Sequence, residues 1–343
     1  ILEYQNSIIK SESNDESIDM LKQLSSTYKS LIGEYKSASE TYQNRDAYET
    51  LFFDNSSQIN AISYIQEKSK NTTIVMVNES HHLPKHRVLT TKILKNLSAN
   101  GYKYLAVEAL QNNDEERINI DGSVSYKSGI YMQEPVFNRL IKEAKKYGFQ
   151  IISYDNMSKN RDAVSAKNII KKTFDLDKNA KVLIHVGYDH INEKKNLAFH
   201  LKDLLDINPL TIDQTYLENT QIKVGLKSFP IAFIDQQKNA WSAKPSEYDL
   251  TIYWPKVPNI NGREYWLNIN TNTIKSNPDW CNNIFPCFIE VYNSDDSESD
   301  ITPIDKFLWH EKSNFFNIII GEGSSYIQAY DSKTGKLIKT SII

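Results

Sequence analysis

Short apolar runs rich in β-branched residues recur along the middle of this 343-residue chain, and they constrain its fold more than any other feature. Amphipathic segments of helical length separate the runs. This alternation is typical of β-α-β units, which build a mostly parallel sheet flanked by helices. We therefore predict an α/β fold, with strands at residues 73–77, 103–107, 149–154, 181–186 and 231–234.

Residue types at the ends of the amphipathic segments support helices between these strands. Pro84 suits the first turn of a helix and Gly101 suits its end, with apolar residues four apart in between. Residues 135–147 repeat this arrangement, and a further helix is expected over residues 162–173.

The two ends of the chain differ from the middle. Residues 1–70 are polar with apolar positions at helical spacing, which predicts an N-terminal helical segment. Residues 71–254 carry the α/β pattern. Residues 255–343 predict a small antiparallel β module that ends in a hairpin, with strands at 265–269, 288–292, 316–320, 326–330 and 336–342.

Charge and hydropathy exclude some classes of partner. The 40 Lys and Arg nearly balance the 43 Asp and Glu, so no overall field would gather nucleic acid or an anionic membrane. No run approaches the roughly 20 apolar residues of a membrane-spanning helix. The sequence does not begin with Met, which fits a mature exported protein of the periplasm or cell envelope, although a cytoplasmic location also fits.

The chain has two cysteines, Cys281 and Cys287. No second Cys or His pair stands nearby to complete a thiolate zinc site, which leaves a disulfide and two free thiols as alternatives. We expect the disulfide, which requires the segment between them to turn back on itself. A disulfide would fit an oxidising compartment.

Ionisable residues stand at the ends of four consecutive predicted strands. In a parallel sheet the carboxyl ends of the strands share one edge, and ligands bind in the crevice there. Each residue alone could be a loop charge or a satisfied histidine, but four coincidences at equivalent positions favour a site. We predict that one cleft collects Glu79, His81, Glu108, Asp155, His185 and His190, with His82 and His86 nearby and with His200 and His310 elsewhere.

His190 is expected to matter more to function than His185. Alternation along the fourth strand turns His185 away from Ile184, so it should be buried and hydrogen-bonded against a covering helix. Gly187 should let the chain turn sharply and present His190 to the crevice.

Two of these groups share a spacing, Asn78-x-x-His81 and Gly187-x-x-His190, with Glu108 between them. In this the chain resembles the Tiki superfamily, which groups Tiki proteases, TraB proteins, erythromycin esterases and ChaN-like haem-uptake proteins. Members carry two G-x-x-H motifs and an intervening glutamate. Asn78 replaces the usual first Gly, and Asn is the non-glycine residue that best tolerates a turn with positive φ.

The resemblance spans about residues 73–235, and Arg161 resembles the arginine that follows the third strand in TraB-like members. It implies a hydrolase with a small-molecule or peptide substrate, an esterase or a metallopeptidase-like enzyme. Two versions stay open. A divalent metal could be held by His81, Glu108 and His190 and activate water. Without metal, a histidine oriented by Glu79 or Glu108 could be the general base.

Two other classes of function compete with hydrolysis. One is a ChaN-like haem- or metal-binding protein, with His81, His86 and Tyr188 as residues near the haem. The other is a non-catalytic exported module whose C-terminal β-domain binds a partner or a glycan through aromatic residues, among them three Trp residues. Burial in the core is the more ordinary role for those residues, Trp254, Trp266 and Trp280.

Overall fold

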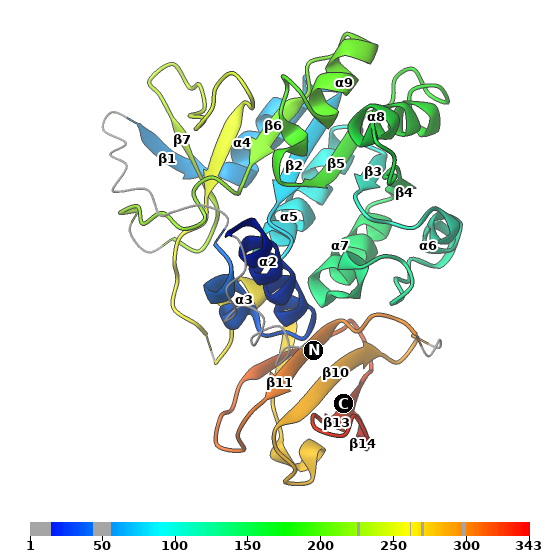
Figure 1. Cartoon of the computed structure of the whole chain (residues 1–343), viewed down its shortest axis with the longest axis vertical. Coiled ribbons are helices and arrows are strands. Elements are labelled where there is room, and N and C mark those ends of the chain that lie inside the picture. The colour runs from blue at the N-terminus through cyan, green and yellow to red at the C-terminus, as the bar shows by residue number, and fades with distance from the viewer. Residues whose placement is uncertain (1–14, 44–55, 225–226, 261, 269–270, 297–299) are drawn as a thin grey trace.

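A computed structural model describes residues 15–43, 56–224, 227–260, 262–268, 271–296 and 300–343. Figure 1 shows the central α/β part, with helices α2 (Asp15–Leu31) and α3 (Tyr35–Thr41) below its sheet and a separate set of antiparallel strands at the bottom of the view. None of the described helices is long and apolar enough to cross a membrane.

An eight-stranded sheet forms the centre of the molecule, in the order β1-β7-β8-β6-β2-β5-β3-β4. Neighbouring strands from β8 to β4 pair in parallel, whereas β7 pairs antiparallel with both β1 and β8. The predicted α/β fold with a mostly parallel sheet is confirmed. The strands are β1 (Ser57–Asn60), β2 (Ile74–Glu79), β3 (Tyr104–Val107), β4 (Gln150–Ser153), β5 (Val182–Gly187), β6 (Leu210–Asp213), β7 (Ile231–Ile234) and β8 (Leu250–Tyr253).

Helices cover both faces of this sheet, which is why its strands read as continuous apolar runs. Val75 and Val77 of β2 pack in one core cluster with α4 (Ala61–Ser69), α5 (Lys85–Ala99) and α7 (Pro135–Lys146). Ile74 and Met76 point the other way, into a cluster with α8 (Arg161–Lys172) and α9 (Leu197–Leu205). Successive residues of a strand therefore alternate between the core under α4, α5 and α7 and the core under α8 and α9.

Three expectations about the elements were wrong. Residues 231–234 form β7, which runs antiparallel, and β1, β6 and β8 had not been expected. Residues 265–268 form a 3-10 helix, η4, in place of a strand, and residue 269 lies outside the described residues. Tyr265, Trp266 and Leu267 are all buried, and such a short apolar run does not distinguish strand from helix by its period.

The C-terminal part contains the expected small antiparallel sheet, in the order β11-β10-β13-β14, and a separate pair, β9 with β12. Trp254, Trp266 and Trp280 are all buried, as their ordinary role predicts. The division at residues 70 and 254 stays a prediction, although β1 and α4, placed in its first part, pack on the large sheet. The strands are β9 (Asn272–Lys275), β10 (Cys287–Asn293), β11 (Asp305–Trp309), β12 (Asn317–Ile320), β13 (Ser325–Asp331) and β14 (Leu337–Ile342).

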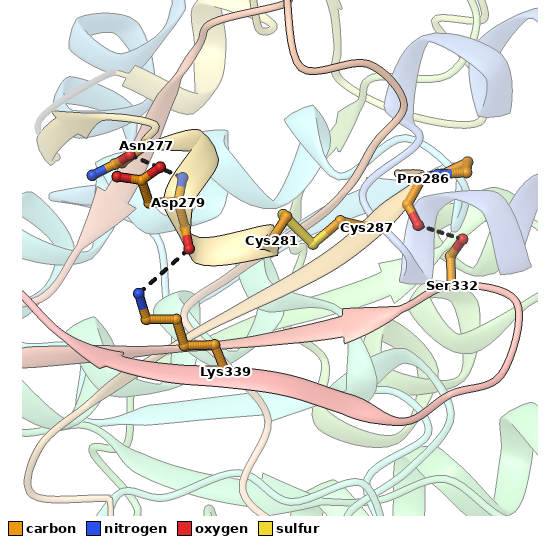
Figure 2. The surroundings of a disulfide bond; sticks show 7 residues. All are labelled: Asn277, Asp279, Cys281, Pro286, Cys287, Ser332 and Lys339. Atoms are coloured by element: carbon orange, nitrogen blue, oxygen red, sulfur yellow. Dashed lines mark hydrogen bonds between the residues drawn. A yellow bond between two sulfur atoms is a disulfide. The ribbon is translucent and has the colours of Figure 1, made fainter. Parts of the chain in front are cut away.

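Cys281 and Cys287 form a disulfide, as predicted, with their Cα atoms 6.0 Å apart. Asn282 and Asn283 both have positive φ, 45° and 63°, and turn the segment back between the two cysteines. Figure 2 shows that this loop is also hydrogen-bonded to the β13–β14 hairpin, because Lys339 donates to the carbonyl of Asp279 over 3.4 Å. On the other side of the loop, Ser332 donates to the carbonyl of Pro286 over 2.8 Å.

We expect thiol titration of the denatured, unreduced protein to find no free thiol, and two after reduction. Reduction should lower the free energy of unfolding by about 2 kcal/mol, the loop-closure value for so short a loop. Urea denaturation with and without reductant measures this. Two thiols in the unreduced protein would contradict the bond.

Candidate functional site

Charged and polar side chains gather at the carboxyl edge of the large sheet in two networks. The inner network is buried and consists of Glu79, His81, Arg87, Glu134 and His185. The outer network is partly exposed and consists of Glu108, Asp155, Arg161, Asp162 and His190.

Arg87, on the first turns of α5, is the centre of the inner network. Its Nε donates to Glu79 Oε2 over 2.7 Å and its Nη2 donates to Glu79 Oε1 over 2.8 Å. Nη2 also donates to the carbonyl of His81 over 3.0 Å, and Nη1 donates to Glu134 Oε2 over 2.9 Å. The guanidinium side chain is 1% exposed, so these carboxylates are what compensates its buried charge.

Glu134 is fully buried and caps the N-terminus of α7. Its side chain accepts from the backbone N–H groups of Val136 and Phe137, over 2.9 and 3.2 Å. Its other oxygen accepts from the Tyr35 hydroxyl of α3 over 2.8 Å. This one carboxylate therefore ties α3, α5 and α7 together beneath the site.

Glu79, the last residue of β2, holds two imidazoles. Burial alone would raise its pKa, but the charges of Arg87 and His185 and the hydrogen bonds from both histidines hold the pKa of Glu79 well below its usual range. An ionised carboxylate only accepts hydrogen bonds. His81 Nδ1–H therefore donates to Oε1, and His185 Nε2–H donates to Oε2, each over 2.9 Å.

His185 lies where alternation places it, on the face opposite Ile184. It is buried, and its Nδ1 lies within hydrogen-bonding distance of the Thr90 hydroxyl of α5, at 2.9 Å. Its two ring nitrogens are both occupied, which fits a residue that positions Glu79.

His81 has one ring nitrogen, Nε2, directed away from the inner network. Tyr131 stacks on the ring, with 4.0 Å between centroids, and Tyr188 meets it edge-on at 5.0 Å. These contacts and the bond to Glu79 fix the plane of the imidazole. Its Nε2 then faces the end of β5, where Glu108 also lies.

Glu108 follows β3 and joins the two networks. Its Oε2 accepts from the backbone N–H of Gly187, and its Oε1 accepts from Arg161 Nη2 over 2.5 Å. Arg161, at the start of α8, also binds Asp155 through two nitrogens, each over 2.7 Å. The Arg161 side chain is 36% exposed, in contrast to buried Arg87, so this cation is within reach of a ligand.

His190 lies in the 3-10 helix η3 (Tyr188–Ile191) after β5. Its Nδ1 is 2.6 Å from Asp162 Oδ1, and its Nε2 is 3.8 Å from Glu108 Oε1 and 3.4 Å from Arg161 Nη1. Burial lowers the pKa of His190, but the hydrogen bond to Asp162 and the charge on Glu108 outweigh it, and the pKa is raised above its usual value.

A glycine is needed at position 187 because a side chain there would collide with neighbouring groups. The expectation that Gly187 makes a sharp turn was wrong. Its φ and ψ of −81° and 147° are open to any residue, and the left-handed residue is the next one, Tyr188, with φ of 41°. A Cβ at position 187 would lie 2.5 Å from His81 Nε2 and 2.9 Å from Glu108 Oε2. The absent side chain therefore leaves room for both groups at the end of β5.

Asn78 also differs from its expected role. It belongs to β2, where it pairs with Val186, and does not make a turn with positive φ. Its side chain donates to the carbonyl of Tyr188 and to Asp213 Oδ1, over 2.9 and 3.0 Å, and accepts from Gln214 N–H over 2.7 Å. Asn78 thus fastens β2 to the ends of β5 and β6.

The remaining predicted residues lie around this edge or away from it. His82 and His86 are buried; burial lowers the pKa of His82 to about 3, and His86 Nδ1 accepts from the Ser80 N–H over 3.0 Å. The Tyr188 hydroxyl accepts from Gln23 of α2 over 3.0 Å, so α2 lies against the edge. His200 and His310 lie elsewhere, on α9 and after β11.

The expected single cleft is thus two networks that meet between His81 and Glu108. Within the described ranges, no group of three or more His, Cys, Asp or Glu side chains is arranged to hold a metal ion. Glu108, expected as a ligand, already accepts from Arg161 and Gly187.

Sequence reasoning missed Arg87, Glu134, Asp162 and Tyr131. Two of them had a signal in the sequence. Glu134 precedes a proline at the start of a predicted helix, the position of an N-cap, and Asp162 adjoins the arginine that had been singled out. The sequence signal for Arg87 was weak, because it consisted only of a charged residue before the apolar pair Val88-Leu89.

No known family's sequence profile and no curated protein matches the chain. Parts of it are similar to solved structures: the type III effector HopBA1 (13% identity, TM-score 0.34, 46% of this chain and 85% of that one), ChaN of Campylobacter jejuni in a study of haem binding (10%, 0.36, 60% and 98%), and the RRSP effector domain of a MARTX toxin from Vibrio vulnificus (13%, 0.32, 58% and 46%). Likenesses this slight carry no argument, and the resemblance to the Tiki superfamily stays a prediction.

Replacing Glu79 by Gln should destabilise the fold by about 3 to 5 kcal/mol, because buried Arg87 would lose its main partner. The pKa of Glu79 is lowered in the folded state, so its contribution is complete above its ordinary pKa of 4.5 and is lost as the pH falls below that value. The difference between wild type and Glu79→Gln, measured by urea denaturation, should therefore shrink on acidification.

Glu67→Gln is the matched control, because Glu67 pairs with Lys70 on the surface, with a side chain 71% exposed. Its stability should equal that of wild type. Equal stability of Glu79→Gln and wild type at pH 7 would contradict the account of the inner network.

Proposed function

We propose that the protein is a hydrolase whose centre works by general acid–base catalysis at the carboxyl edge of the sheet. One observation carries this proposal. Two imidazoles, His81 and His190, are each oriented by a carboxylate through Nδ1. The Nε2 of His190 lies 3.8 Å from Glu108 Oε1, and the Nε2 of His81 lies beside Gly187, whose N–H binds the other oxygen of Glu108. A base that a third group orients is the arrangement that general-base catalysis needs.

The electrostatic surroundings assign different tasks to the two histidines. His81 donates its Nδ1 proton to ionised Glu79, so its Nε2 lone pair can accept a proton from water. The raised pKa of His190 favours the imidazolium near neutral pH, which can give up its Nε2 proton. His81 is therefore the general base and His190 the general acid.

The reaction balances with these groups alone. His81 takes a proton from water, the water oxygen bonds to the acyl carbon of the substrate, and the bond to the leaving group breaks as His190 protonates that group. Arg161, partly exposed beside His190, stabilises the negative charge that develops on the acyl oxygen. Glu108, whose Oε1 lies 3.8 Å from His190 Nε2, can then pass to His190 the proton that His81 releases.

A metal-dependent version would need His81, Glu108 and His190 as ligands. In the structure the Arg161 cation occupies the Oε1 side of Glu108, where it would repel a metal ion. The charge distribution thus supports the metal-free version.

Haem binding through His81, His86 and Tyr188 is the alternative function. These residues are engaged with Glu79, Ser80 and Gln23 respectively, so a haem would have to displace contacts that the structure holds. Haem binding would be seen as a visible absorption band that His81→Ala abolishes.

We also propose that the protein acts in an oxidising compartment outside the cytoplasm. The Cys281–Cys287 disulfide supports this, because such bonds persist chiefly where thiols are not kept reduced.

His81→Gln and Glu108→Gln should each lower kcat/KM at least ~100-fold in hydrolysis of p-nitrophenyl esters or fluorogenic peptides, because each removes a proton-transfer group. Thermal melting should show folded protein in both. His200→Gln, on α9, is the control and should keep full activity. Loss of activity on treatment with a chelator and its return with zinc would contradict the metal-free mechanism.

Asp162→Asn should lower the pKa of His190, because it removes the carboxylate whose hydrogen bond and charge raise it. Activity falls as His190 loses its proton, so the alkaline limb of the pH–rate profile should move to lower pH together with that pKa. NMR titration of the imidazole signals measures the pKa without substrate. Asp175→Asn, whose side chain is 57% exposed, should change neither quantity. An unmoved alkaline limb would rule out His190 as the acid.

A further inference from the structure

A cavity lies away from the carboxyl-edge site, between α5, α7 and the C-terminal strands. It has a volume of about 470 Å³, within the range of small-molecule sites, and such sites are frequent where two parts of a chain meet. We call it the α5–α7 groove. Its lining changes in character from floor to rim.

The floor of the groove is apolar. Its side chains come from α5, α7, η4 and the segments around β11 and β12, and all are nearly buried: Val88, Val136, Trp266, Leu267, Ile304 and Ile319. An aliphatic chain laid on this floor would cover it and lose its own contact with water.

The rim of the groove is cationic. Five basic side chains line it, Lys92, Lys95, Arg139, Lys142 and Lys146. Three carboxylates are near the rim: Glu143, Glu322, which binds Lys146 over 2.9 Å, and Asp296, which binds Lys142 over 2.8 Å. Arg139 also feels Asp305 and Glu134, but these are already paired with Arg263 and Arg87. Positive charge is therefore in excess at the mouth of an apolar groove.

Burial lowers the pKa of two of these basic side chains. Arg139 Nη1 is buried without a hydrogen-bond partner among the described residues, and burial lowers the pKa of this guanidinium. Burial also lowers the pKa of Lys92, to about 8. An anion beside Arg139 would supply an acceptor to its Nη1 and negative charge to both cations.

We propose that the α5–α7 groove binds a single-chain anionic amphiphile, a fatty acid or an alkyl phosphate. The alkyl chain lies on the apolar floor and the anionic head lies at Arg139, Lys92 and Lys95. This ligand site is separate from the proposed hydrolytic centre and does not depend on it.

Octyl phosphate and octanoate, used as monomers with the full chain, test this proposal by isothermal titration calorimetry. Octyl phosphate or octanoate should bind with one-to-one stoichiometry. Octanol lacks the charge and inorganic phosphate lacks the chain, so each should bind at least tenfold more weakly. Octanol binding as tightly as both anionic probes would overturn the role of the cationic rim.

Substitutions locate the site. Lys92→Gln combined with Lys95→Gln, at positions not fully buried, should weaken the binding of the anionic probe at least tenfold. Lys178→Gln, whose side chain is 80% exposed outside the groove lining, is the matched control and should bind as wild type. Wild-type affinity in the double variant would overturn the assignment.

Trp266 gives an independent readout on the floor of the groove. Probe binding should change the tryptophan emission of wild type, and this change should vanish in Trp266→Phe while calorimetric binding persists. An emission change that survives in Trp266→Phe would place the ligand elsewhere. Cosedimentation with phosphatidylglycerol vesicles, without binding of either monomeric probe, would identify a bilayer surface as the ligand and overturn the proposal.

Discussion

The buried guanidinium of Arg87 is the interaction on which the carboxyl edge depends. It binds Glu79 at the end of β2 and Glu134 at the start of α7, and its charge is the largest of the effects that keep the pKa of Glu79 low. An isolated buried carboxylate would take up a proton. Glu79 would then cease to be a pure acceptor, and the imidazole of His81 would lose the orientation that leaves its Nε2 outward.

The two networks of the carboxyl edge differ in their exposure to solvent, and this difference separates a rigid part from a reactive part. The inner network lies in a medium of low dielectric constant, where its charges interact strongly and fix geometry. The outer network contacts solvent through Arg161 and His190, so a ligand can reach it. Glu108 lies beside the boundary of the two parts, because its Oε2 accepts from the N–H of Gly187. That glycine is needed for space, since a Cβ at its position would collide with both the imidazole of His81 and the carboxylate of Glu108.

Much of the fold could be predicted because both faces of the sheet are covered. The resulting apolar runs identified β2, β3, β4 and β5, and the edge rule for parallel strands then placed Glu79, Glu108 and His190 near one another. The partners of these residues could not be predicted as well. Arg87 and Glu134 are 47 residues apart, and a buried charge reveals its partner only in three dimensions. The helix η4 was missed because its apolar residues are buried on all sides and follow no period.

The strand order has a consequence for how the chain reaches this structure. β2 lies between β6 and β5, so its first residue, Ile74, pairs with Val182, more than a hundred residues later. Tyr35 and Glu134 are 99 residues apart, and Tyr126 binds Glu290 across 164. Contacts of such long range slow folding, because the chain must close large loops before it gains their energy. During synthesis on the ribosome, Glu79 therefore emerges long before His185, and its two histidines can be held together only after the second half of the sheet has been made.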